Sequence, residues 1–271
     1  MGVLLQKPPL YHASPKPIEG GVLTPGPQHT CVYEQFKGTP EQCNHEGNLL
    51  FAGQSQTAAY AYAFKTKEMC NCGVHSLADG DNVTITIIAD KDQFLHKLHS
   101  GELQPTIYRM SQQNAFEQVH DKNGKPMGEW TSRQGVSLTD CQSMKVESLD
   151  EAMEKGVQVF FLKPGLHPGD WHKLTHAVCD QITAELKPLS ANPHFAAQLS
   201  NEHSNRYFAF LQSMVDQGIV EHHNATRQIC PLDLQQGALM PTRKPSHFVE
   251  HVVQLAFSAM FGGPDMAPAR Q

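Results

Sequence analysis

The segment from Gly47 to Tyr62 constrains the fold of this chain more than any other. It reads Gly-Asn-Leu-Leu-Phe-Ala-Gly-Gln-Ser-Gln-Thr-Ala-Ala-Tyr-Ala-Tyr. The apolar run from Leu49 to Ala52 has the length of a buried strand. Ser55 is a suitable N-cap for the alanine-rich stretch that follows, which predicts a helix to about Lys65. The segment therefore predicts a strand that turns directly into a helix.

Further strands and helices are expected up to residue 163. Residues 82–89 alternate and are rich in β-branched side chains, which is typical of a strand. Residues 91–99 suit a short helix stopped by Gly101. Other expected elements are strands at 106–110, 116–120, 129–132 and 157–162, and a helix at 149–155 that ends at Gly156. This mixture predicts an α+β fold for residues 1–163.

The pattern changes after Pro164. Apolar residues recur at helical spacing in 167–187, 193–217 and 246–261, and strand signals nearly vanish. We expect residues 164–271 to form a helical extension, with a role in substrate recognition.

Charge and cysteine usage exclude several classes of protein. The formal net charge is -6, and the 21 Lys and Arg residues form no runs, which argues against nucleic-acid binding. No window approaches the length of a membrane span, and the apolar stretch of residues 2–5 is too short for a signal peptide. The chain has 7 cysteines at irregular spacing, which favours a reducing compartment over a disulfide framework.

Three pieces of the first region together resemble the ADP-ribosyltransferase superfamily. They are Leu10-Tyr11-His12-Ala13-Ser14-Pro15, the segment 47–62, and Gly128-Glu129-Trp130-Thr131-Ser132. In that superfamily a first strand ends in Tyr-His-Gly/Ala and a second reads Gly-x-x-Phe-Ala before a tyrosine-bearing helix. A later strand edge delivers a glutamate. The order and spacing agree over roughly the first 160 residues, in the manner of bacterial toxin and effector enzymes.

The resemblance implies a core of two small packed β-sheets that binds NAD, as substrate, in the cleft between them. Cleavage of the nicotinamide–ribose bond builds positive charge on the sugar, and a nearby carboxylate stabilises such charge. Glu129 is the expected catalytic residue. His12 would bond a ribose hydroxyl, Ala13 would hold the nicotinamide amide through its main chain, and Tyr60 or Tyr62 would stack on the ring. The full predicted NAD-binding set is Tyr11, His12, Ala13, Ser14, Phe51, Ala52, Ser55, Tyr60 and Tyr62.

The activity implied is transfer of ADP-ribose from NAD to a protein side chain. Such chains are often bacterial effectors or toxins that reach the reducing cytosol of a host cell by a specialised secretion route. The expected partner is a host protein, with ubiquitin and ubiquitin-pathway proteins among the candidates. Neither a nucleic acid nor a membrane is an expected partner, and no metal ligand belongs to the predicted site.

Departures from the family pattern keep other interpretations open. Ala13 stands where the family often has glycine, and Leu50 where one branch has tyrosine, so an inactive relative acting as a protein-interaction module is an alternative. A second is zinc binding by Cys43, His45, Cys70, Cys72 and His75, whose single-residue gaps are tight for zinc; otherwise they are loop residues. A third is an RNA 2′-phosphotransferase, which shares the fold but is disfavoured by the acidic balance.

Overall fold

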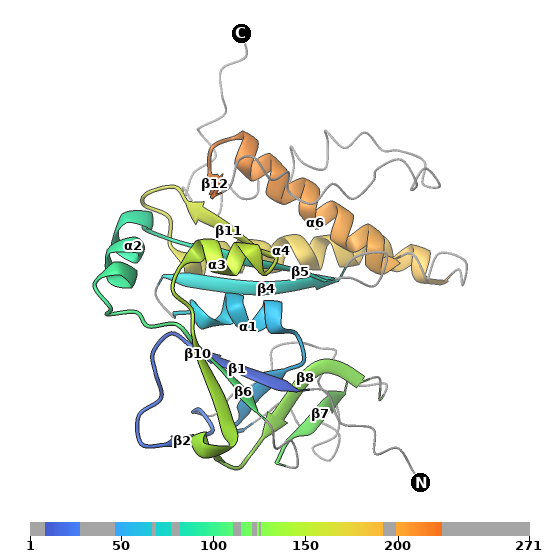
Figure 1. Ribbon diagram of the computed structural model, residues 1–271. Helices are drawn as coiled ribbons and strands as arrows, with labels where there is room; N and C mark the ends of the chain where they lie inside the picture. Colours follow the sequence, from blue (N-terminus) through green and yellow to red (C-terminus); the bar gives the residue numbers. More distant parts are fainter. Residues whose placement is uncertain are drawn as a thin grey trace. The chain divides into compact units, whose positions relative to one another are not determined.

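The computed structural model describes residues 9–27, 47–66, 69–76, 82–110, 115–120, 124, 126–191 and 199–223 (Figure 1). The fold is α+β, with helices beside several antiparallel strand pairs. The chain divides into two compact units, one of Met1–Lys65 with Leu95–Val157, the other of Thr66–Phe94 with Gln158–Gln271. The helix predicted at 246–261 and the cysteines at 31, 43 and 230 lie outside the described residues. A separate helical extension beginning at residue 164 stays a prediction.

The first unit is built on a six-stranded sheet with the order β10-β6-β1-β3-β8-β7. Every neighbouring pair in this sheet is antiparallel. Its strands are β1 Leu10–Ser14, β3 Leu50–Gly53, β6 Thr106–Met110, β7 Glu117–His120, β8 Pro126–Ser132 and β10 Cys141–Lys145. The short strands β2 Val22–Leu23 and β9 Val136–Ser137 pair separately, and the 3-10 turn η1 Leu138–Asp140 follows β9.

Two helices of the first unit begin at the serines that suit a helix start. Helix α1, Gln56–Ala63, is capped by Ser55, whose Oγ accepts from the Ala58 amide, and it packs against β1, β3 and β6. Helix α3, Leu149–Glu154, is capped in the same way by Ser148. It stops before Gly156, whose φ of 94° lies in the left-handed region that favours glycine. One side of the sheet contributes Leu10, Leu50, Ala52, Tyr108 and Met110 to an apolar cluster that also contains Leu23, Phe116 and Val136.

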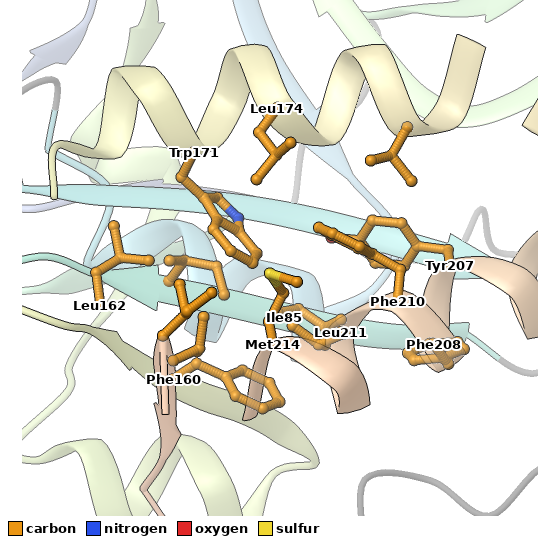
Figure 2. Close-up of a cluster of buried hydrophobic side chains, with 14 of the residues drawn as sticks. Ile85, Phe160, Leu162, Trp171, Leu174, Tyr207, Phe208, Phe210, Leu211 and Met214 are labelled. Carbon is orange, nitrogen blue, oxygen red and sulfur yellow. The ribbon is translucent and has the colours of Figure 1, made fainter. Parts of the chain in front are cut away.

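The second unit packs two long helices on a four-stranded sheet with the order β12-β11-β5-β4. Figure 2 shows its core, where Trp171 and Leu174 from one helix and Phe210, Leu211 and Met214 from the other meet Ile85, Phe160 and Leu162 of the strands. The elements are β4 Cys70–Ser76, β5 Asn82–Ile88, β11 Val157–Leu162, β12 Val220–His222, α4 Pro168–Leu186, η2 Lys187–Ala191 and α6 Leu199–Asp216. Helix α2, Lys91–His99, begins in this unit and ends in the first.

Two strands of the second unit are not predicted from the sequence. Residues 70–76 form strand β4 rather than a loop, paired along their whole length with β5. Strand β12 lies beyond residue 164, where only helices were expected, and it pairs with the last three residues of β11. Both strands lack the alternating β-branched pattern. Their pairing therefore depends on the apolar partner strand rather than on their own propensity. In the part of the chain that the structure describes, no helix is long and apolar enough to span a bilayer.

The second unit should lose stability when its core is truncated on helix α4. Ile182 has 0 % exposure, so Ile182→Ala should lower the free energy of unfolding by roughly 2–5 kcal/mol. The chain has 2 tryptophans, one in each unit, so a Trp130→Phe background leaves Trp171 as the reporter. Guanidinium unfolding followed by its fluorescence measures the effect. Lys173→Ala, on the exposed side of the same helix, is the control, and an equal loss from both would contradict this core.

Candidate functional site

The three sequence motifs lie on neighbouring strands of the six-stranded sheet. Tyr11 of β1 stands opposite Gly53 of β3, and Gly53 stands opposite Glu129 of β8. Directly opposed residues of antiparallel strands point to the same face of the sheet. Tyr11, Gly53 and Glu129 therefore form a row across three strands, which we call the Tyr11–Gly53–Glu129 row. At the usual strand spacing its two ends are roughly 10 Å apart.

Gly53 leaves a gap in the middle of this row. Tyr11 and Glu129 are half-buried, and Gly53 has no side chain between them. A Cβ at Gly53 would lie 3.6 Å from the Gly128 carbonyl oxygen, which is ordinary contact, and the backbone of Gly53 is not in the left-handed region. The fold therefore does not require glycine here, and among the described residues only the Gly128 carbonyl lies within 4 Å of such a Cβ.

His12 is held at the junction of β1 and β3. Among the described residues these strands share one ladder pair, Tyr11 with Gly53, and the His12 Nδ1 lies 2.7 Å from the Phe51 carbonyl oxygen. Because a carbonyl oxygen only accepts, Nδ1 must donate. Burial lowers the pKa of His12, and the bond to Phe51 offsets this in part. The neutral ring therefore presents Nε2 as a hydrogen-bond acceptor.

The structure does not bring His12 and Glu129 onto one face. His12 follows Tyr11 along β1, so alternation turns it to the side opposite the row. It stands opposite Tyr108 of β6, and the two ring centroids are 6.3 Å apart. His12 thus lies next to the apolar cluster of the sheet, while Glu129 shares its face with Tyr11.

The two tyrosines of α1 have different surroundings. Tyr60 is buried, and its hydroxyl donates to the Glu151 carboxylate at 3.2 Å. The same carboxylate accepts from the Glu147 amide at 2.8 Å. Burial, followed by the charge and the hydrogen bond of Glu151, raises the pKa of Tyr60. Tyr62 is half-buried, and the Lys65 ammonium lies 5.1 Å from its ring centroid. Of the two rings, that of Tyr62 is therefore the more exposed, and the Tyr60 hydroxyl is bonded to α3.

The remaining predicted residues take part in helix capping, local hydrogen bonds and packing of the sheet. The Ser55 hydroxyl caps α1, and the Ser14 hydroxyl accepts from the Lys16 amide at 3.4 Å. Ala52 is buried in the apolar cluster of the sheet. Ala13 lies within β1 opposite Ile107, and half-buried Phe51 offers its carbonyl to His12.

Zinc ligation stays a prediction. The described residues include no group of three or more His, Cys, Asp or Glu side chains able to hold a metal ion. The sulfur atoms of Cys70 and Cys72 are 3.9 Å apart on β4. Cys43, His45 and the side chain of His75 lie outside what the structure describes.

Sequence reasoning missed two features. One is Gly53, which lies in the second motif. Only the register of β3 shows that it stands between Tyr11 and Glu129. The other is a hollow of about 720 Å³ in the second unit, lined mainly by residues 89–93 after β5 and by residues 161–167 at the end of β11 and beyond it. Its charges are largely balanced, since the Lys91 ammonium lies 2.6 Å from the Glu221 carboxylate. No motif marks this hollow in the sequence.

Comparison with protein-family models, with curated proteins and with solved structures finds no match for this chain.

The stability of the first unit should depend on pH through His12. Its pKa is below the ordinary value of 6.5, so the unfolded chain takes up a proton first as the pH falls. The free energy of unfolding should therefore decrease from pH 6.5 down to the lowered pKa. His12→Asn keeps a donor near Phe51 but cannot titrate, so the advantage of the wild type should shrink in that window. Denaturant unfolding followed by Trp130 in a Trp171→Phe background measures this, and a pH-independent difference would contradict it.

Proposed function

We propose that the protein is a mono-ADP-ribosyltransferase with an ADP-ribosyltransferase-like core, which moves ADP-ribose from NAD to a protein side chain. The observation that carries the proposal is the Tyr11–Gly53–Glu129 row. Three motifs separated by tens of residues lie on hydrogen-bonded neighbouring strands, with an aromatic ring and a carboxylate on either side of an open glycine.

The row suits cleavage of the nicotinamide–ribose bond. The bond from C1′ to the ring nitrogen breaks, and its electron pair leaves with nicotinamide. A lone pair of the acceptor then forms the new bond to C1′, and the proton of the acceptor passes to Glu129 or to solvent. The Glu129 carboxylate stabilises the positive charge that builds on the ribose and orients the acceptor.

One further side chain would hold the nucleotide. His12 lies on the opposite face, so its bond to the Phe51 carbonyl would support the row by holding β1 against β3 rather than contact the nucleotide. Tyr62 is the better placed of the two tyrosines for stacking on nicotinamide, because its ring is half-buried whereas Tyr60 is buried. Ala13 would contribute only through its main chain.

The acceptor is proposed to be a host protein, ubiquitin and ubiquitin-pathway proteins included. Cys70, Cys72, Cys141 and Cys179 are free thiols, which suits a reducing cytosol. The net charge of -6 favours a protein acceptor over RNA. A bacterial effector delivered into a host cell agrees with both properties.

Removal of the Glu129 charge should abolish turnover. Glu129→Gln keeps the size of the side chain but cannot stabilise a ribosyl cation, so nicotinamide release should fall by about 10²- to 10³-fold. Release from NAD is measured by chromatography, with and without a host-cell lysate. Glu154→Gln, an exposed carboxylate on α3, is the matched control. No release and no calorimetric NAD binding by the wild type would refute the transferase and favour a protein-interaction module.

A methyl group at Gly53 should block the site without unfolding the protein. Gly53→Ala adds one carbon that the fold accepts, but this carbon fills the gap between Tyr11 and Glu129. We expect NAD affinity to fall at least about tenfold, since overpacking a fitted contact costs on the order of 1–3 kcal/mol. Gly128→Ala is the control, because an added Cβ there meets nothing within 4 Å. Unchanged NAD binding by Gly53→Ala would contradict a ligand lying over the row.

A further inference from the structure

The polar row continues beyond the three motif strands. Arg109 of β6 stands opposite Tyr11, and Gln142 of β10 stands opposite Arg109. Since opposed residues share a face, Arg109 lies on the same side of the sheet as Tyr11, Gly53 and Glu129. A guanidinium and a carboxylate thus lie at positions three strand spacings apart, roughly 14 Å, with the ring of Tyr11 and the gap at Gly53 between them.

Arg109 differs from the rest of its strand. The other four residues of β6 are buried, and Arg109 alone is exposed. No described residue makes an ion pair or hydrogen bond with its guanidinium. Arg206 in the second unit shows the opposite case, since it lies 2.8 Å from both Glu185 and Glu202. Arg109 is therefore an uncommitted cation in register with the proposed site.

We infer that Arg109 binds the pyrophosphate of NAD, an inference that rests on the proposed function. A planar guanidinium matches the oxygen atoms of a phosphate with two parallel hydrogen bonds. With the nicotinamide ribose over Gly53 and its hydroxyls toward Glu129, the phosphates extend over Tyr11 toward Arg109. The dinucleotide thus crosses the strands from β8 toward β6.

The test compares ligands that differ in phosphate. Isothermal titration calorimetry measures the binding of NAD and of nicotinamide riboside, which lacks phosphate, to the full-length protein. Arg109→Gln should weaken NAD binding about 10- to 100-fold, the range of hydrogen bonds to a charged group, and leave riboside binding unchanged. The NAD affinity of Arg109→Lys should lie between those of the wild type and Arg109→Gln, because lysine keeps the charge without the paired donors.

Arg133→Gln is the matched control. Arg133 is also an exposed arginine of the first unit, just after β8, and its substitution removes the same charge as Arg109→Gln. A similar loss of NAD affinity in both variants would overturn the inference, because it would show only a long-range effect of net charge. Equal weakening of NAD and riboside by Arg109→Gln would overturn it as well.

Failure of the inference is distinguishable from failure of the proposed function. If the wild type releases nicotinamide in a Glu129-dependent way, but Arg109→Gln binds NAD as well as the wild type, the phosphate role is refuted and the transferase stands. If the wild type neither binds NAD nor releases nicotinamide, the proposed function fails and the phosphate role fails with it.

Discussion

The pairing of β3 with two neighbours is the constraint on which the proposed site depends. This strand has four residues, and all four pair with β8, while Gly53 alone also pairs with β1. A slip of one residue would turn every side chain of β3 to the other face. Leu50 and Ala52 prevent the slip, because they belong to the apolar cluster of the sheet. The same burial fixes Gly53 opposite Tyr11 and Glu129.

The junction of β1 and β3 is also short, with one ladder pair among the described residues. Past their one described ladder pair, a side chain takes the role of a backbone donor, since His12 Nδ1 bonds to the Phe51 carbonyl. This bond selects the tautomer of the ring and fixes its orientation. The hydrogen bond thus helps to hold β1 against β3, which keeps Tyr11 opposite Gly53.

The sequence predicts the elements that have strong local patterns and misses those that depend on a partner. Alternation in β5 and the serine cap of α1 are visible without any structure. The Cys-Asn-Cys-Gly pattern of β4 is not that of a strand, and it forms one only because β5 lies beside it. The resemblance predicts that the three motifs lie next to one another. It does not predict which face of the sheet each motif residue occupies. Register is set by long-range burial, so the separation of His12 from Glu129 and the alignment of Arg109 could not be read from spacing.

The hydrogen-bonding groups along the sheet point to a particular order of ligand groups. On the face of the Tyr11–Gly53–Glu129 row, Glu129 accepts and Arg109 only donates. A ligand that satisfies both must offer donors near β8 and acceptors near β6. Ribose hydroxyls are donors and phosphate oxygens are acceptors. A ribosyl phosphate therefore fits with its ribose near β8 and its phosphate near β6. A free sugar would leave Arg109 unsatisfied, and a free phosphate would be repelled by Glu129. Because each simpler ligand meets a mismatched group, the row favours a nucleotide that carries both parts.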